Sequence, residues 1–176
     1  RVGAEADERD PDARAHLALT DQMYDIISSE PSNPWMAGLA SLCTRDFFET
    51  ARDHLNDGGI FVQFAHAYEM DWSVFSMIGR TFAGVFPNSI LVSTDPAAGG
   101  PDYLLIGTKG NAKHDARVAA GRLRYAQGSK NVTLPDHRLF YNMIVSEDLK
   151  SLFGEGPIHT ENRPRIEFAA PRLLYV

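Results

Sequence analysis

The stretch that decides the fold is YDIISSEPSNPW, residues 24–35. It begins with an apolar run that contains two isoleucines, residues 24–28, which is typical of a buried strand in a parallel sheet. Two prolines and an asparagine follow, and neither a strand nor a helix can continue through them. The stretch therefore predicts a buried strand whose carboxyl end leads directly into a polar loop.

On both sides of this stretch, helical and strand patterns alternate. Apolar residues have helical spacing over residues 12–20, before the strand. After it, one helix is expected to begin at the N-cap Thr44 and to stop at Gly58-Gly59, and another to begin at the N-cap Asp71 and to break at Pro87. Three further apolar strands are predicted, at residues 60–64, 89–93 and 103–108.

This alternation predicts an α/β fold with a mostly parallel sheet and helices on both faces. A short connection, residues 94–102, joins the last two of these strands, so one strand is expected to be antiparallel. We expect one domain over residues 1–176, with a frayed end at 1–11, the sheet and its helices at 12–110, and C-terminal helices and a tail at 111–176. The last part is expected to hold helices at 111–124 and 147–153 and an extended stretch at 166–168.

Composition narrows the class of protein. The 176 residues are 44% hydrophobic and 23% charged, as in one globular domain, and the net charge of −6 argues against nucleic acid as a partner. The single cysteine, Cys43, excludes a disulfide framework, and no apolar run is long enough to cross a bilayer. We therefore expect a cytoplasmic domain. Because the chain begins with Arg1, we expect a fragment, a processed product or a partial gene model.

Two loops are candidates for the chemistry, because ligands of such sheets bind beyond the carboxyl ends of the strands. The first loop holds Glu30, Ser32, Asn33 and Trp35. A carboxylate placed there can bind an ammonium group and accept its proton, and an aromatic side chain can form a wall of the site. The alternative is that Glu30 only caps the backbone amides of its own loop.

The second loop follows the strand at residues 60–64. Its polar groups, Gln63, His66, Tyr68 and Glu69, would suit an amine substrate, while the alternative places Gln63 in a helix interface and the others in solvent. His66 with Glu69 and Asp71 forms the one local cluster that contains a histidine, and no two histidines have the close spacing of a zinc site. We expect no metal.

Four stretches of this chain resemble the spermidine synthase family: YDIISSEPSNPW, CTRDFFETARDHLNDGGIFVQF, PDYLLIGTKG and TENRPRIEFAAPR. The similarity spans residues 12–172 and is greatest to the bacterial fused spermidine synthase-like proteins, some of which join this domain to a transporter-like membrane region. The resemblance implies the C-terminal part of a class I methyltransferase-like, Rossmann-like sheet. It also implies transfer of an aminopropyl group from decarboxylated S-adenosylmethionine to an amine such as putrescine.

The resemblance also assigns roles to residues. Asp12 and Ala13 match the pair that contacts the adenine, Glu30 falls on the catalytic carboxylate, and Gln63 falls on a glutamine that contacts the substrate. The adjoining positions Ser32, Asn33 and Trp35 would line the amine site. Glu30 stands where the family has aspartate, which moves the charge by roughly an ångström. Asn33 stands in place of a second aspartate, which weakens the attraction for a diamine.

The resemblance predicts that an N-terminal half of the domain precedes this chain. That half would carry the glycine-rich cofactor loop, the acidic residue that holds the ribose, and three strands of the sheet. Without it, the strand at residues 24–28 becomes an edge, which favours association, for instance as a homodimer. Two other functions remain open: a methyltransferase of the same fold that uses S-adenosylmethionine, and a non-catalytic domain that binds polyamine or regulates an attached transporter.

Overall fold

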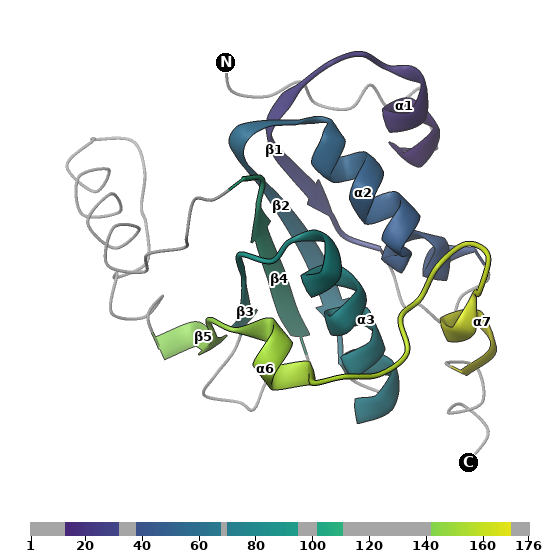
Figure 1. Ribbon diagram of the computed structural model, residues 1–176, viewed down its shortest axis with the longest axis vertical. Coiled ribbons are helices and arrows are strands. Elements are labelled where there is room, and N and C mark those ends of the chain that lie inside the picture. The colour runs from purple at the N-terminus through teal and green to yellow at the C-terminus, as the bar shows by residue number, and fades with distance from the viewer. Residues whose placement is uncertain (1–12, 32–37, 68–69, 95–101, 111–141, 170–176) are drawn as a thin grey trace.

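The computed structural model describes residues 13–31, 38–67, 70–94, 102–110 and 142–169 (Figure 1). These residues form five strands and a set of helices, most of them short. In chain order they are α1 (Ala13–Leu19), β1 (Tyr24–Ser29), the 3-10 helix η1 (Leu39–Cys43), α2 (Arg45–Asp53), β2 (Leu55–His66), α3 (Trp72–Val85), β3 (Ser89–Ser93), β4 (Asp102–Thr108), β5 (Ile144–Ser146), α6 (Leu149–Phe153) and α7 (Arg165–Ala169).

The five strands form one mixed sheet in the order β1-β2-β4-β3-β5. β1 is parallel to β2, and β4 lies antiparallel between β2 and β3, so β1, β2 and β3 run in one direction. The predicted α/β fold with an antiparallel strand among parallel ones is therefore confirmed. β5, antiparallel to β3, was not predicted, and it extends the sheet beyond the predicted range 12–110.

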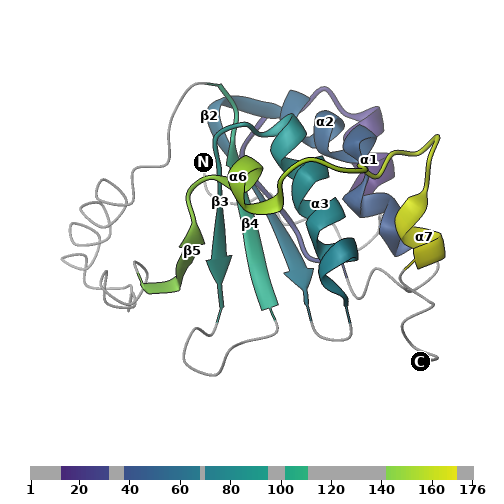
Figure 2. The ribbon, with the colours of Figure 1, turned by 60° about the horizontal axis from the view of Figure 1, so that its bottom comes forward.

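The helices α2, α3 and α6 lie on one side of the sheet (Figures 1 and 2). Their core is aromatic: the ring of Phe48 in α2 lies 5.8 Å from that of Phe61 in β2 and 5.3 Å from that of Phe82 in α3. Val62 and Phe64, on the opposite face of β2, are half-buried. The helix expected at residues 111–124 lies outside the described residues, so helices on both faces remain a prediction.

The two predicted N-caps are confirmed. Thr44 Oγ1 accepts a hydrogen bond from the N–H of Phe47 at 3.2 Å, and Asp71 Oδ1 accepts one from the N–H of Val74 at 2.9 Å. Each side chain satisfies one of the backbone N–H groups that the first turn of a helix leaves without a partner.

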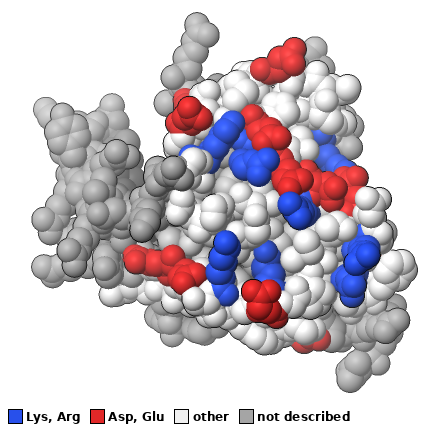
Figure 3. Space-filling view, viewed as in Figure 1, with Lys and Arg blue, Asp and Glu red and all other residues white. Residues whose placement is uncertain are grey.

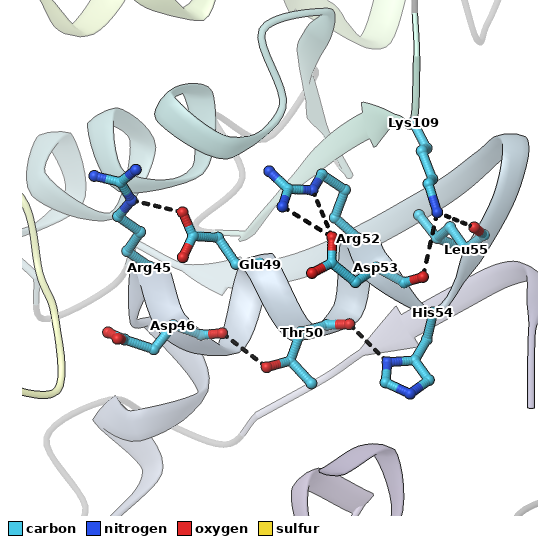
Figure 4. A network of polar contacts seen from close by, with 9 residues as sticks. All are labelled: Arg45, Asp46, Glu49, Thr50, Arg52, Asp53, His54, Leu55 and Lys109. Atoms are coloured by element: carbon cyan, nitrogen blue, oxygen red, sulfur yellow. Dashed lines mark hydrogen bonds and ion pairs between the residues drawn. The ribbon is translucent and has the colours of Figure 1, made fainter. Parts of the chain in front are cut away.

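The predicted end of the first long helix is wrong. α2 ends at Asp53, and Gly58-Gly59 lie within β2. Figure 4 shows the reason: Lys109 Nζ donates to the carbonyl oxygens of Asp53 and Leu55, at 3.2 and 2.6 Å, where α2 ends and β2 begins. Lys109, which follows β4, thus satisfies the carbonyl oxygens at the end of the helix that a glycine cap was expected to satisfy. Gly58 instead adopts a φ of 77° in the part of β2 where the register with β1 shifts.

The C-terminal part contains one confirmed and one wrong prediction. The helix expected at residues 147–153 is present as α6. The stretch expected to be extended, Ile166–Phe168, lies in helix α7. Ile166 is fully buried, and its N–H donates to Nδ1 of the buried His159 at 3.3 Å, which fixes the start of α7 against the core. In the described part of the chain, no helix has both the length and the apolar character to cross a membrane.

Candidate functional site

The candidate site lies where β1 and β2 end. Because these strands are parallel and Ser29 is paired with Gln63, their carboxyl ends lie at the same edge of the sheet. Glu30 follows β1 directly and is exposed, whereas Pro31 is buried. Pro31 lines a void of about 10 Å³ together with Phe64 and His66 of β2, so the start of the loop packs against the end of β2. Ser32, Asn33 and Trp35 lie outside the described residues.

The structure places Gln63 away from solvent. Its side chain is fully buried, on the same face of β2 as Phe61, whose ring contacts those of Phe48 in α2 and Phe82 in α3. Nε2 donates to the carbonyl oxygen of Phe64 at 3.0 Å, and Oε1 has no hydrogen-bond partner among the described residues. A buried acceptor without a partner is costly, so a donor that reached Oε1 would be favoured. Contact between Gln63 and a substrate at the edge would require the side chain to change rotamer.

A histidine–carboxylate pair at the same edge was not predicted. His66 Nδ1 lies 2.8 Å from Asp102 Oδ1, and the ring of His66 lies 4.6 Å from that of Phe64. Of the two residues expected beside His66, Asp71 caps α3, and Glu69 lies outside the described residues. Asp102 could have been found only from the antiparallel register of β2 and β4. That register pairs Asp102 with His66, 36 positions away in the sequence.

Two other titratable groups near this edge have shifted pKa values. Hydrogen bonds from the Ser73 hydroxyl and the Val74 N–H lower the pKa of Asp71, so this carboxylate is ionised at neutral pH. Burial raises the pKa of Cys43 to about 12. Cys43 is therefore a thiol at neutral pH and is a poor nucleophile.

The predicted adenine site is described in part. Ala13 is the first residue of α1, and Asp12 lies outside the described residues. The next residue, Arg14, forms an ion pair with Glu161, and the N–H of Glu161 donates to Asp46 Oδ2 at 2.9 Å. Asp46 belongs to the first turn of α2, which follows the loop that leaves β1. Glu161 therefore links the first turn of α1 to the first turn of α2.

The charges of the described residues are mixed. On the face shown in Figure 3, Lys and Arg side chains are interspersed with Asp and Glu, whereas a nucleic-acid site usually gathers basic residues in a patch. Among the described residues, no three His, Cys, Asp or Glu side chains come together as a metal site would require.

Solved structures of spermidine synthases share this fold. One, in complex with the transition-state analogue AdoDATO, has a TM-score of 0.54 and 16% identity, and the match covers 76% of this chain and 43% of that one. The enzyme from Thermotoga maritima has a TM-score of 0.54 and 18% identity, with coverages of 76% and 44%. A probable spermidine synthase from Corynebacterium glutamicum ATCC 13032 has a TM-score of 0.53 and 15% identity, with coverages of 85% and 52%.

These likenesses show a spermidine synthase-like, Rossmann-like fold. The chain matches about half the length of each of the three proteins. No family model and no curated protein matches the sequence. The resemblance to the fused proteins and the expected N-terminal half remain predictions.

Proposed function

We propose that this chain is part of a cytoplasmic aminopropyltransferase-like domain of polyamine synthesis. The parent protein would transfer an aminopropyl group from decarboxylated S-adenosylmethionine to an amine such as putrescine. The observation that carries this proposal is the exposed carboxylate of Glu30, directly after β1, in a fold shared with spermidine synthases. The solved structures are about twice as long as the matched part, so the proposal concerns the parent protein.

In this proposal Glu30 binds the ammonium group of the acceptor and takes up its proton. The neutral nitrogen then attacks the aminopropyl carbon next to the sulfonium. The carbon–sulfur bond breaks, and its electron pair stays on sulfur, which leaves as a neutral thioether. The amine is the nucleophile, so no covalent intermediate with the protein forms. Asp12 and Ala13 would hold the adenine, and Ser32, Asn33, Trp35 and Gln63 would contact the amine. No metal takes part.

The test is Glu30→Gln in the parent protein, with aminopropyl transfer measured by product formation. We expect kcat/KM to fall by roughly a hundredfold to ten-thousandfold, the contribution of a general base. Glu155→Gln is a matched control, because Glu155 is exposed in the segment that follows α6. If the Glu30 variant kept wild-type kcat/KM, the catalytic assignment would be wrong.

The same assay separates the proposal from a methyltransferase of this fold. The parent protein is given the acceptor amine with either S-adenosylmethionine or its decarboxylated form. Aminopropyl transfer requires the decarboxylated form, whereas methyl transfer with the carboxylated form would overturn the proposed reaction.

One observation favours a second candidate, a non-catalytic domain that binds polyamine or regulates an attached transporter. The amide of Gln63 is fully buried and its Nε2 is bonded to the backbone, so the described site offers the amine fewer contacts than the resemblance implies. This candidate predicts binding of spermidine by calorimetry without turnover. Transfer activity that is lost in Glu30→Gln would exclude it.

A further inference from the structure

A second cavity, with a volume of about 300 Å³, lies between strands β3, β4 and β5 and helices α3 and α6. Its walls come from the loop after β2, the first turn of α3, and strands β3, β4 and β5, with α6 closing one side. The lining residues are Ala67, Met70, Trp72, Phe75, Leu91, Tyr103, Val145 and Leu152. This volume lies at the lower end of the range of small-molecule sites, about 300–1,000 Å³.

Three aromatic rings form one connected wall of the cavity. The ring of Phe75 lies 5.9 Å from that of Trp72 and 5.2 Å from that of Tyr103, tilted by 38° and 52°. Such rings offer their faces and edges to a further flat ring, and each aromatic contact adds to the gain from burial alone. Trp72 is 60% exposed and Val145 is 51% exposed, so the cavity opens to solvent between α3 and β5.

The chemistry of the walls restricts the ligand. None of the described lining residues carries a charge, so a charged group in the cavity would lose its hydration without gaining a partner. The ionised carboxylate of Asp71, next to Trp72, further disfavours an anion. The part of the ligand that enters the cavity must therefore be uncharged.

Two polar groups of the lining residues have no hydrogen-bond partner among the described residues: the hydroxyl of Tyr103 and the indole N–H of Trp72. A phenol can donate or accept, and an indole N–H donates. A ring with one polar atom at its edge could therefore form a hydrogen bond as well as stack.

The geometry points to a binding site for a small, flat, uncharged aromatic molecule that carries a hydroxyl group or a ring nitrogen. The cavity is too small for a helix, which is roughly 10 Å wide. Glu30 is absent from the lining, so this inference does not depend on the proposed function.

The test is a titration of the full chain with 2-naphthol, followed by proton–nitrogen NMR. The chain has two tryptophans, and a Trp35→Phe variant assigns the two indole N–H signals. We expect a saturable shift of the Trp72 indole signal and a much smaller one at Trp35. Naphthalene-2-sulfonate, the same ring with a negative charge, is expected to bind more weakly.

Two variants locate the site. Val145→Trp fills the opening and is expected to abolish the shift, while Leu19→Trp, at another exposed apolar position, is expected to leave it unchanged. Tyr103→Phe removes the hydroxyl and is expected to weaken binding by about threefold to tenfold. If Val145→Trp does not fold, the Tyr103→Phe comparison decides. A Trp72 signal that does not respond, or one that responds through self-association in sedimentation, would overturn the inference.

Discussion

At the scale of single residues, His159 fixes the C-terminal segment to the core. Its Nε2 lies 3.0 Å from the carbonyl oxygen of Ala40, and its Nδ1 accepts a hydrogen bond from the N–H of Ile166. Only the neutral ring with its proton on Nε2 satisfies both contacts. Burial lowers the pKa of His159, and the Ala40 carbonyl and the charges of Glu167 and Asp46 offset this in part.

This arrangement predicts a loss of stability in acid. The unfolded chain takes up a proton on His159 near pH 6.5, whereas the folded chain resists protonation to a lower pH. The free energy of unfolding should therefore fall as the pH drops below about 6.5, and the loss should level off below the folded pKa. Urea unfolding at several pH values measures this. His159→Gln should be less stable at pH 7.5 but should show a shallower decline, and equal declines would contradict the assignment.

Residues whose roles depend on near neighbours were predictable from the sequence. Thr44 and Asp71 cap helices through N–H groups three positions ahead, so the local pattern was enough. The partner Asp102 was missed because it reaches His66 through the register of two strands that are far apart in the sequence. Glu30 was correctly placed at the end of a strand, since that prediction needed only the boundary of β1. The predicted burial of this strand was wrong: no residue of β1 is buried, and Ile26 is 64% exposed.

At the scale of elements, α3 and α6 are held together by a close approach at Gly79. A Cβ added there would lie 2.1 Å from Phe153 Cε2. Arg80 adds a hydrogen bond of 2.9 Å from Nη1 to the carbonyl oxygen of Phe153, at the end of α6. The short α6, five residues long, thus depends on its neighbour rather than on its own helix propensity.

We predict that Gly79→Ala lowers the free energy of unfolding by about 1–3 kcal/mol, the usual cost of overpacking a core. Gly84→Ala, in the same helix, is the control: a Cβ there meets nothing within 4 Å. That variant should gain roughly 0.5–1 kcal/mol, because alanine is the better helix former. Urea unfolding at neutral pH measures both changes, and a destabilisation shared equally by the two variants would contradict the packing argument.

Strands with a continuous apolar run were predicted better than elements without one. Strands β3 and β4 were recognised by their apolar runs to within a residue. β5 has three residues, none of them buried, and α7 has five, so neither contains enough of a period to recognise. Pairing with β3 stabilises β5, and packing of Ile166 against the core stabilises α7. These tertiary contacts cannot be predicted from the local sequence.

At the scale of the whole molecule, the described helices cover one side of the sheet, and no described helix covers the other. Among the described residues the helices pack on one face, while Ile26 of β1 is 64% exposed and Val62 and Phe64 of β2 are half-buried on the other. β1 pairs only with β2 in the described part of the chain, so its second edge is unpaired there. An apolar face beside an unpaired strand edge favours pairing with another chain.

We therefore predict that this 176-residue chain associates with itself, and that Ile26→Lys weakens the association. Burying an isoleucine contributes about 1.5–3 kcal/mol, so its replacement should raise the dissociation constant by roughly tenfold or more. Sedimentation velocity over a series of concentrations measures this. Leu19→Lys is the control, because Leu19 is 88% exposed but lies on α1, away from the sheet. If the two variants changed the dissociation constant equally, the face of the sheet that carries Ile26 would not be the surface through which the chains associate.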